Sequence, residues 1–141
     1  MWRMNPDYMR IRKGVNVMNK VEKTWGWEHW FANTKEYCGK LLFVKCDKWS
    51  SEGRFHYHEI KDETFFVIQG RLILDIAKDD GTYQRMLLYE NDSYRVMPGV
   101  KHRFSASSEG GCKFIEASTH HEDADSFRCK FDEEKGDWLY D

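Results

Sequence analysis

The segment from Gly53 to Glu63 reads GRFHYHEIKDE and combines two histidines with a carboxylate. If it is a β-strand followed by a turn, His56 and His58 lie two residues apart and point to the same side of the sheet. Glu63 follows after the turn and can bring its carboxylate back to the same place. Solvent-facing histidines would show the same spacing, but an interior face would place these groups together as metal ligands.

A third histidine, His102, follows the corner formed by Pro98 and Gly99 in the sequence MPGVKH. This corner can turn the chain so that His102 joins the first pair. Three imidazole nitrogens and one carboxylate oxygen suit Mn, Fe(II), Ni, Co or Zn and leave coordination positions open. We therefore predict one divalent metal ion bound by His56, His58, Glu63 and His102, in a site of catalytic rather than structural type.

The chain around these motifs has the pattern of short strands separated by turns. From about residue 40 onward, apolar and β-branched runs alternate with turn signals such as Gln69-Gly70, Asp80-Gly81 and residues 108–111. No stretch of this region holds a helical period over three turns. The pattern predicts an antiparallel sandwich or barrel.

Composition limits the classes of protein to which the chain can belong. With 141 residues, 40% of them hydrophobic, it has the size of one domain. A formal net charge of −2 argues against a nucleic-acid partner, and no apolar run is long enough to span a bilayer. The four cysteines form no C-x-x-C pair and no secretory apolar segment precedes them, so we expect free thiols in a cytoplasmic protein.

Charge also divides the chain into three parts. Residues 1–20 form a basic arm that we expect to be loosely ordered, residues 21–131 hold the barrel, and residues 132–141 form an acidic tail. The tail, which contains Trp138, either docks on the barrel or is solvated. The many aromatic residues favour a homodimer that buries some of Trp2, Trp25, Trp27, Trp30 and Trp138.

The two histidine motifs together resemble those of the cupin superfamily. The first cupin motif is usually written G(X)5HXH(X)3–4E(X)6G, and His56–Gly70 fits it without a gap, although the leading glycine is nearer, at Gly53. The second motif, G(X)5PXG(X)2H(X)3N, is matched at Gly99 and His102, whereas its closing asparagine is Ala106. The resemblance implies an all-β fold, a double-stranded β-helix (jelly-roll) barrel, with short N- and C-terminal extensions.

A finer resemblance covers roughly residues 21–130. The sequences EKTWGWE at Glu22–Glu28 and EDADSFR at Glu122–Arg128 are similar to parts of the C-terminal cupin domain of type II mannose-6-phosphate isomerases. Small stand-alone cupin sugar isomerases, including lyxose isomerases, are also similar. The resemblance implies a metal-dependent aldose–ketose isomerase that acts on a sugar or sugar phosphate through an enediolate, and it leaves the substrate open.

Such an isomerase needs a base near the metal in addition to the metal itself. Glu116 is the best candidate if its strand turns this residue inward rather than toward solvent, because an apolar lining would suit a base. Lys45 shares a face with Phe43 and either directs a cation at the substrate or lies on the surface. Only one of His120 and His121 can face the barrel mouth, and His120 is a candidate proton shuttle.

Three further residues are candidates for substrate binding. Arg128 can bind a phosphate bidentately, or it can pair with Asp123 or Asp125 as a structural clasp. Phe65 shares its face with Glu63 and is expected to line the cavity wall. Phe104 follows His102 at strand spacing and is either core or a wall of the same cavity.

Two other functions are compatible with the same motifs. A non-catalytic carbohydrate-binding or sensing cupin would keep the barrel without needing a base. An Fe(II) cupin dioxygenase would use the same three histidines and one glutamate, so the ligand set alone does not separate it from an isomerase.

Overall fold

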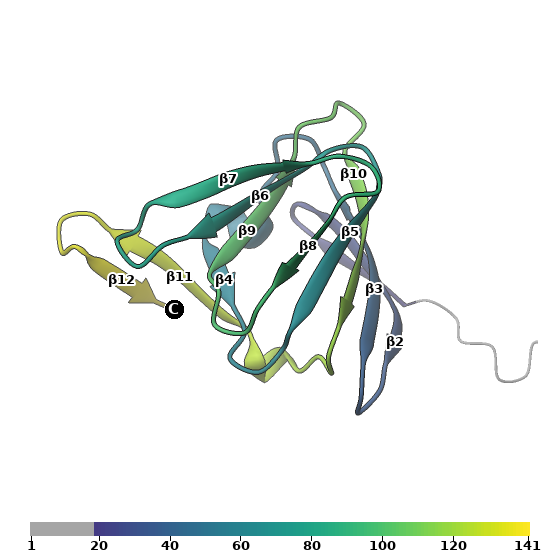
Figure 1. The fold of residues 1–141 in the computed structure, drawn as a ribbon, viewed down its shortest axis with the longest axis horizontal. Helices are drawn as coiled ribbons and strands as arrows, with labels where there is room; N and C mark the ends of the chain where they lie inside the picture. The colour runs from purple at the N-terminus through teal and green to yellow at the C-terminus, as the bar shows by residue number, and fades with distance from the viewer. Residues whose placement is uncertain (1–18) are drawn as a thin grey trace, which may run out of the picture.

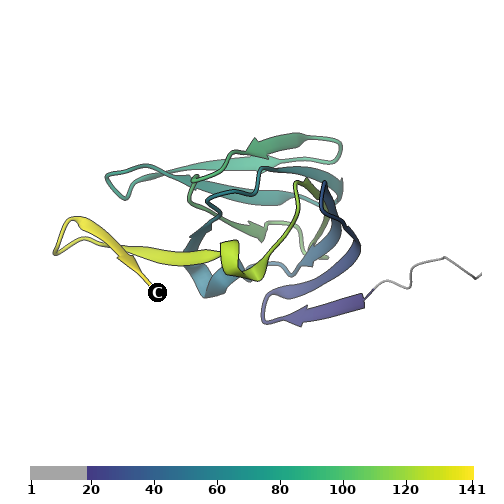
Figure 2. The same cartoon turned by 90° about the horizontal axis from the view of Figure 1, so that it is seen from below.

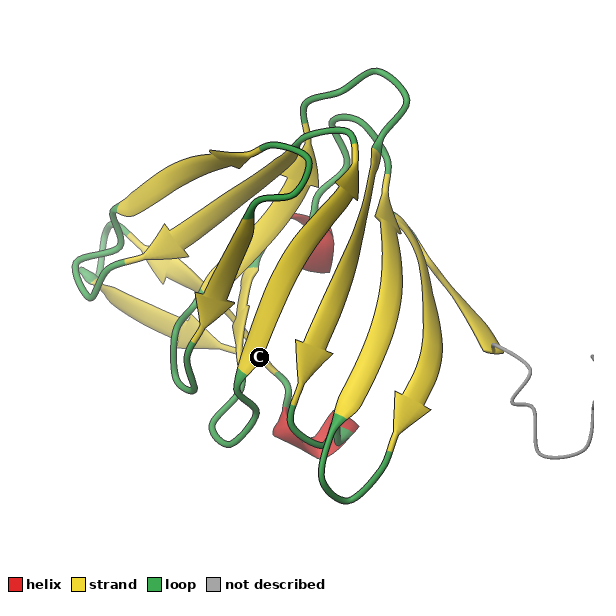
Figure 3. Ribbon diagram, turned by 45° about the vertical axis from the view of Figure 1, so that its right-hand side comes forward, coloured by secondary structure: helices red, strands yellow, loops and turns green. Residues whose placement is uncertain are grey.

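The computed structural model describes residues 19–141, which fold into two six-stranded antiparallel sheets that face each other (Figures 1 and 3). The first sheet has the order β1-β2-β3-β10-β5-β8 and the second β12-β11-β4-β9-β6-β7. The strands are β1 (Asn19–Lys23), β2 (Gly26–Asn33), β3 (Cys38–Val44), β4 (Phe55–Tyr57), β5 (Glu63–Gln69), β6 (Leu72–Ala77), β7 (Tyr83–Leu88), β8 (Ser93–Val96), β9 (His102–Ala106), β10 (Cys112–Ser118), β11 (Phe127–Asp132) and β12 (Asp137–Tyr140). Two short 3₁₀ helices, η1 (Ser50–Gly53) and η2 (Asp123–Asp125), complete the fold, and the predicted all-β jelly roll is confirmed.

The space between the sheets changes from apolar to polar along the strands. One end is a hydrophobic core in which the rings of Phe65, Phe104 and Phe114 meet edge to face at centroid distances of 5.1–5.9 Å. The inward residues that carry this change are Leu42 and Lys40 in β3, Phe65 and Glu63 in β5, Phe104 and His102 in β9, and Phe114 and Glu116 in β10. The alternation of each strand therefore builds a stable core and, two residues further along, a polar site.

Strand register aligns these polar residues with one another. Glu116 in β10 lies opposite Lys40 in β3 and opposite Phe65 in β5, and Ser118 lies opposite Glu63. Since strands β3 and β10 are far apart in the sequence, only the sheet brings their polar residues together. The register therefore determines which groups can share a cavity.

Gly70, the last residue of the first motif, occupies a position that no side chain can fill. Its φ is +86°, and a Cβ built there would lie 2.3 Å from the Gly111 carbonyl oxygen. Glycine alone adopts this conformation without strain and permits this close approach. The motif glycine thus allows the turn between β5 and β6 to pack against the loop before β10.

The acidic tail is part of the second sheet. Strand β12 pairs with β11, and the hairpin that they form projects from the body of the barrel (Figure 2). Trp138 is buried against Phe55 and Phe131 in a second, smaller hydrophobic cluster. Of the two alternatives for the tail, docking is the one that the structure shows.

Several other sequence predictions concern exposed or undescribed parts of the chain. Trp25 and Trp138 are covered within their own chain, so a homodimer would have to use Trp27 and Trp30, and the dimer stays a prediction. Trp2 and most of the basic arm lie outside the described residues. All four cysteines are free. Within residues 19–141, no helix combines the length and apolar character that a membrane span requires.

Candidate metal centre

Three histidines converge at the polar end of the barrel. His56 lies in β4 directly opposite His102 in β9, and His58 follows at the end of β4. One ring nitrogen from each lies within 4.8 Å of those of the other two. The two-residue spacing on β4 and the register between β4 and β9 thus produce the arrangement that the sequence predicted.

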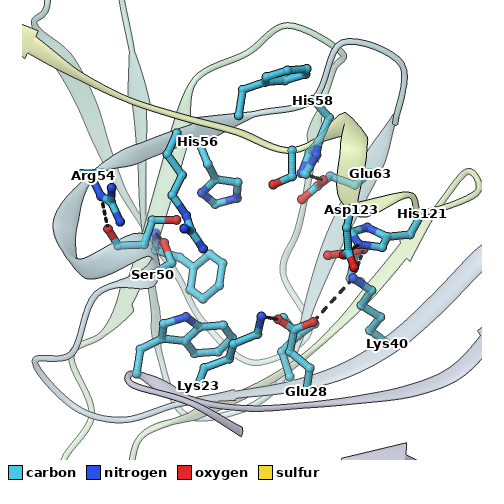
Figure 4. A pocket seen from close by; sticks show the side chains of 18 of the residues that line it. Lys23, Glu28, Lys40, Ser50, Arg54, His56, His58, Glu63, His121 and Asp123 are labelled. Carbon is cyan, nitrogen blue, oxygen red and sulfur yellow. Dashed lines mark hydrogen bonds and ion pairs between the residues drawn. The ribbon is translucent and has the colours of Figure 1, made fainter. Parts of the chain in front are cut away.

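Glu63, the first residue of β5 on the facing sheet, lies beside His58 (Figure 4) and also approaches His102. Its Oε2 lies 3.1 Å from His58 Nε2, and its Oε1 lies 3.4 Å from His102 Nε2. Nevertheless, Glu63 Oε2, His102 Nε2 and His56 Nδ1 are buried without a hydrogen bond of acceptable geometry. Buried polar atoms rarely lack partners, so a cluster of them around one point fits a bound cation.

Backbone carbonyls fix the tautomers of two of these rings. His58 Nδ1 donates to the Asp125 carbonyl oxygen at 2.6 Å, and His102 Nδ1 donates to that of Val100 at 2.8 Å. Because a carbonyl can only accept, Nδ1 carries a proton in each ring, so in the neutral form of the ring Nε2 has the lone pair that a metal ion needs. Outer hydrogen bonds of this kind orient metal-binding histidines.

The pKa values of the cluster favour the forms that bind metal. Burial lowers the pKa of His56 well below its usual value, and the neighbouring His102 and His58 lower it further. Burial would raise the pKa of Glu63, but its contacts with His102, His58 and Lys61 outweigh burial and hold that pKa well below the usual range. A neutral His56 and an ionised Glu63 are the protonation states that a divalent ion requires.

Asp125 in η2 holds the loop between the clustered histidines and Glu63. One carboxylate oxygen accepts from the backbone N–H of Glu59 at 2.8 Å, and the other accepts from that of Lys61 at 2.9 Å. Asp123 instead lies 3.0 Å from His121 Nε2. The clasp between Arg128 and either aspartate, one of the two alternatives from the sequence, is therefore not formed.

This role of Asp125 leads to a test of stability and its pH dependence. Replacing Asp125 with asparagine should lower the free energy of unfolding by about 1–3 kcal/mol, because backbone N–H groups in the loop lose a charged acceptor. Burial would raise the Asp125 pKa, but the backbone hydrogen bonds of Lys61, Glu59 and Ile60 outweigh it and lower that pKa below its ordinary 3.8. A lowered folded-state pKa stabilises the fold at pH values above 3.8, and this contribution is lost as the pH falls through the lower folded value.

Urea unfolding of wild type and Asp125→Asn between pH 3 and pH 7 measures both effects. The difference between the two proteins should shrink toward the acid end. Asp79→Asn is the matched control, because Asp79 is exposed and its side chain makes no hydrogen bond within the described residues. Equal stability of Asp125→Asn and wild type at pH 7 would contradict the role of the loop contact.

His56, His58 and Glu63 form one wall of a cavity of about 700 Å³, and charged side chains line much of the rest of it. Lys61 is its central cation, with Nζ 3.0 Å from Glu116 Oε2, 3.3 Å from Glu63 Oε2 and 3.1 Å from His121 Nδ1. Burial would lower the Lys61 pKa, but the charges of Glu116 and Glu63 outweigh burial and raise it. Lys61 therefore stays protonated between the metal ligands and Glu116.

A second buried lysine extends the network away from the histidines. Lys40 Nζ lies 3.5 Å from Glu28 Oε1 and 3.9 Å from Glu116 Oε2, and 4.1 Å from the centroid of the Trp30 ring. Trp30 Nε1 donates to the same Glu28 oxygen at 2.8 Å. Donors and acceptors thus alternate along this wall.

The structure corrects three placements predicted from the sequence. Lys45 is exposed, because Leu42 and Val44, not Phe43, face the interior of β3. His120 lies outside the cavity, with Nδ1 2.7 Å from the Thr34 carbonyl oxygen, and its neighbour His121 faces inward. Phe65 belongs to the hydrophobic core and does not line the cavity.

The remaining candidates lie on the cavity wall. Glu116 is 4% exposed and faces the interior, although its lining contains lysines and is not apolar as expected. Phe104 lines the cavity while packing in the core. Arg128 lines the cavity and is open to solvent.

Sequence reasoning missed the buried cations of the site. Lys40 alternates with Leu42 and Val44 and could have been found had these residues, rather than Phe43, been taken to mark the inner face. Lys61 lies in the loop between β4 and β5, where no period shows the direction of a side chain. The buried acid Glu28 was missed as well, although a charged residue between Trp27 and Trp30 in the aromatic strand β2 could have indicated a functional position.

The facing sheets and the convergent His/Glu cluster define a jelly-roll protein with a candidate mononuclear metal centre. A family model for the cupin domain matches residues 47–118, which is just over half of the chain. The chain therefore belongs to the cupin family. No curated protein sequence matches it, and the finer resemblance to mannose-6-phosphate isomerases is not confirmed.

Solved structures agree with the fold. Oxalate decarboxylase from Bacillus subtilis has a TM-score of 0.67 and 15% identity, with 79% of this chain and 30% of that chain covered. KdgF from Halomonas sp. has a TM-score of 0.60 and 17% identity, with 75% of this chain and 91% of that chain covered. The oxalate decarboxylase of Lactobacillus farciminis, in a formate complex, has a TM-score of 0.66 and 17% identity over 79% of this chain and 33% of its own. The present chain thus spans about a third of the length of the oxalate decarboxylases, and at these identities the likeness is one of fold.

Proposed function

We propose that the protein is a metal-dependent isomerase that interconverts the aldose and ketose forms of a sugar or sugar phosphate. The observation that carries this proposal is that a carboxylate outside the ligand set, Glu116, opens into the same cavity as His56, His58 and Glu63. Lys61 joins the two parts by contacting both Glu116 and Glu63. A ligand set and a separate acid–base group in one cavity are the two parts that this reaction needs.

The chemistry divides between the metal and the side chains. A divalent ion held by His56, His58, Glu63 and His102 would act as a Lewis acid toward the carbonyl and hydroxyl oxygens of the sugar. Glu116 takes the proton from the hydroxyl-bearing carbon beside the carbonyl and returns it to the former carbonyl carbon, while the proton of that hydroxyl group passes to the former carbonyl oxygen. Protonated Lys61 holds the Glu116 carboxylate in place.

The rest of the cavity fits a polyol. Lys40, Glu28 and His121 present donors and acceptors that can hydrogen-bond successive hydroxyl groups. Burial lowers the pKa of His121, and the charges of Lys40 and Lys61 lower it further, which supports a neutral ring that accepts at one nitrogen. Several polar groups that converge in one cavity are a common feature of small-molecule sites.

Metal analysis together with an isomerisation screen tests the proposal. We expect one divalent ion per chain, and conversion of at least one aldose or aldose phosphate that stops on chelation and returns when metal is restored. Binding of sugars without conversion would support the carbohydrate-sensing alternative. Bound iron with oxygen uptake on addition of substrate would support the dioxygenase alternative, and either result would overturn the isomerase.

A further inference from the structure

Two arginines lie on the cavity wall beside His56, away from Lys61 and Glu116, and the proposed reaction leaves them without a role. Arg54 precedes β4 in extended conformation and is two residues from His56, so both point to the same side. Arg128 in β11 lies directly opposite His56 in β4. Both arginines line the cavity, and Figure 4 shows Arg54 on the side of the histidines opposite to His121.

The charge of this wall is only partly neutralised within the protein. Arg54 forms an ion pair with the side chain of Asp141, and its Nε donates to the Ser51 carbonyl oxygen at 3.1 Å. Arg128 forms no ion pair within residues 19–141. Glu52, exposed at the same edge, pairs with neither arginine in the described part of the chain. Within the described part of the chain, the site therefore presents a guanidinium without an ion-pair partner beside the candidate metal ligands.

Asp141 shows what kind of group this wall binds. Its backbone N–H donates to the Arg128 carbonyl oxygen at 3.1 Å, which positions its carboxylate on Arg54. Asp141 also lines the cavity. A carboxylate of the protein thus lies against the Arg54 guanidinium on this wall and contacts Arg128 only through the backbone.

The turn that presents Arg54 is conformationally costly. Ser51 and Glu52 have φ values of 51° and 57°, a left-handed region that residues other than glycine rarely adopt. The turn is held because Ser50 Oγ accepts from the Phe104 N–H at 3.0 Å and Arg103 Nη1 donates to the Gly53 carbonyl oxygen at 2.8 Å. Backbone strain retained at a cavity wall is typical of ligand-binding segments.

We propose that Arg54 and Arg128 form an anion subsite, so that the substrate carries a phosphate or carboxylate group in addition to its sugar hydroxyls. The anionic group displaces Asp141 and binds to the two guanidinium groups, whose planar donors match its oxygens. The carbonyl end of the same molecule then lies toward His56, His58 and Glu116. This inference rests on the proposed isomerase for the sugar part of the ligand.

Calorimetric binding of mannose, mannose 6-phosphate, mannuronate and inorganic phosphate to the metal-loaded protein tests the subsite. The anionic sugars should bind more tightly than mannose. Comparing the affinities of mannose 6-phosphate and mannuronate then shows whether the subsite prefers a phosphate or a carboxylate group. Arg54→Gln and Arg128→Gln should each weaken binding of that anion about tenfold or more. Asp141→Asn should tighten it by up to about fivefold, because the internal competitor is lost.

Lys130→Gln is the matched control, since Lys130 is an exposed cation on β11 outside the cavity wall and its loss should change binding by less than about twofold. Equal anion affinity in Arg128→Gln and Lys130→Gln, or anionic sugars that bind no better than mannose, would overturn the subsite. Because calorimetric affinity and product formation are separate measurements, arginine-dependent binding with no isomerisation would overturn the isomerase and keep the subsite. Turnover of a sugar together with binding that does not depend on the arginines would keep the isomerase and overturn the subsite.

Discussion

Replacing His58 with alanine is expected to abolish metal retention. The change removes one of three histidines whose ring nitrogens converge within 4.8 Å, and the orientation of its ring is fixed by the Asp125 carbonyl. Loss of an outer hydrogen bond to a ligand already lowers metal affinity about 10–100-fold, so loss of the ligand itself should exceed about 100-fold. Elemental analysis after gel filtration measures the bound metal directly.

His120→Ala is the matched control for this experiment. His120 is a histidine of the same chain whose ring lies outside the cavity, so its removal should leave metal occupancy unchanged. Thermal unfolding of both variants shows whether any loss of metal comes from loss of the fold. A folded His58→Ala protein that retains a full equivalent of metal would refute the proposed ligand set.

The fold and the ligand set could be predicted because both follow from local patterns. His56 and His58 share a face through the two-residue period of a strand, and the turn before Glu63 brings its carboxylate back. His102 needed only the Pro98–Gly99 corner and the register between β4 and β9. The convergence of the three histidines was therefore predictable from their spacing taken together with the two motifs, because each lies in or next to a strand, and the bound metal stays a prediction.

The cavity wall beyond the ligands was less predictable because β3 is apolar on both faces. Phe43 stacks on Trp27 outside the barrel at a centroid distance of 5.6 Å, while Leu42 and Val44 fill the core. A strand with apolar residues on both sides carries no signal for its inner face, so the sequence left Lys45 open between the cavity and the surface, and the structure shows the surface. Lys40 occupies the interior instead.

Tertiary contacts decided the remaining side chains. Lys61 lies in a loop whose direction depends on backbone hydrogen bonds to Asp125, more than sixty residues later in the chain. The choice between His120 and His121 depends on Asn33, which pairs with the backbone of His121 through both its side-chain oxygen and nitrogen. Neither contact has a local pattern. The sequence alone therefore did not identify Lys61 and pointed to His120 where the structure has His121.

Replacing Glu116 with glutamine should preserve the metal and the fold but remove turnover. Glutamine has nearly the same volume and its amide oxygen can still accept from Lys61, which also keeps its contact with Glu63 at 3.3 Å. What is lost is the ability to take up and return a proton. General acid–base catalysis contributes about 10²–10⁴-fold, so kcat for an accepted sugar should fall by that amount.

Glu122→Gln provides the comparison. Glu122 lies between β10 and η2, and its side chain is 64% exposed. Both variants should bind one metal ion and should bind the sugar with similar affinity, since neither change removes a metal ligand. A loss of kcat in Glu116→Gln with unchanged metal content and sugar binding separates proton transfer from a structural role. Unchanged turnover in that variant would remove Glu116 as the base. The reaction would then need another group on the same wall, and the candidates are Lys61, which contacts Glu116, and His121, which contacts Lys61.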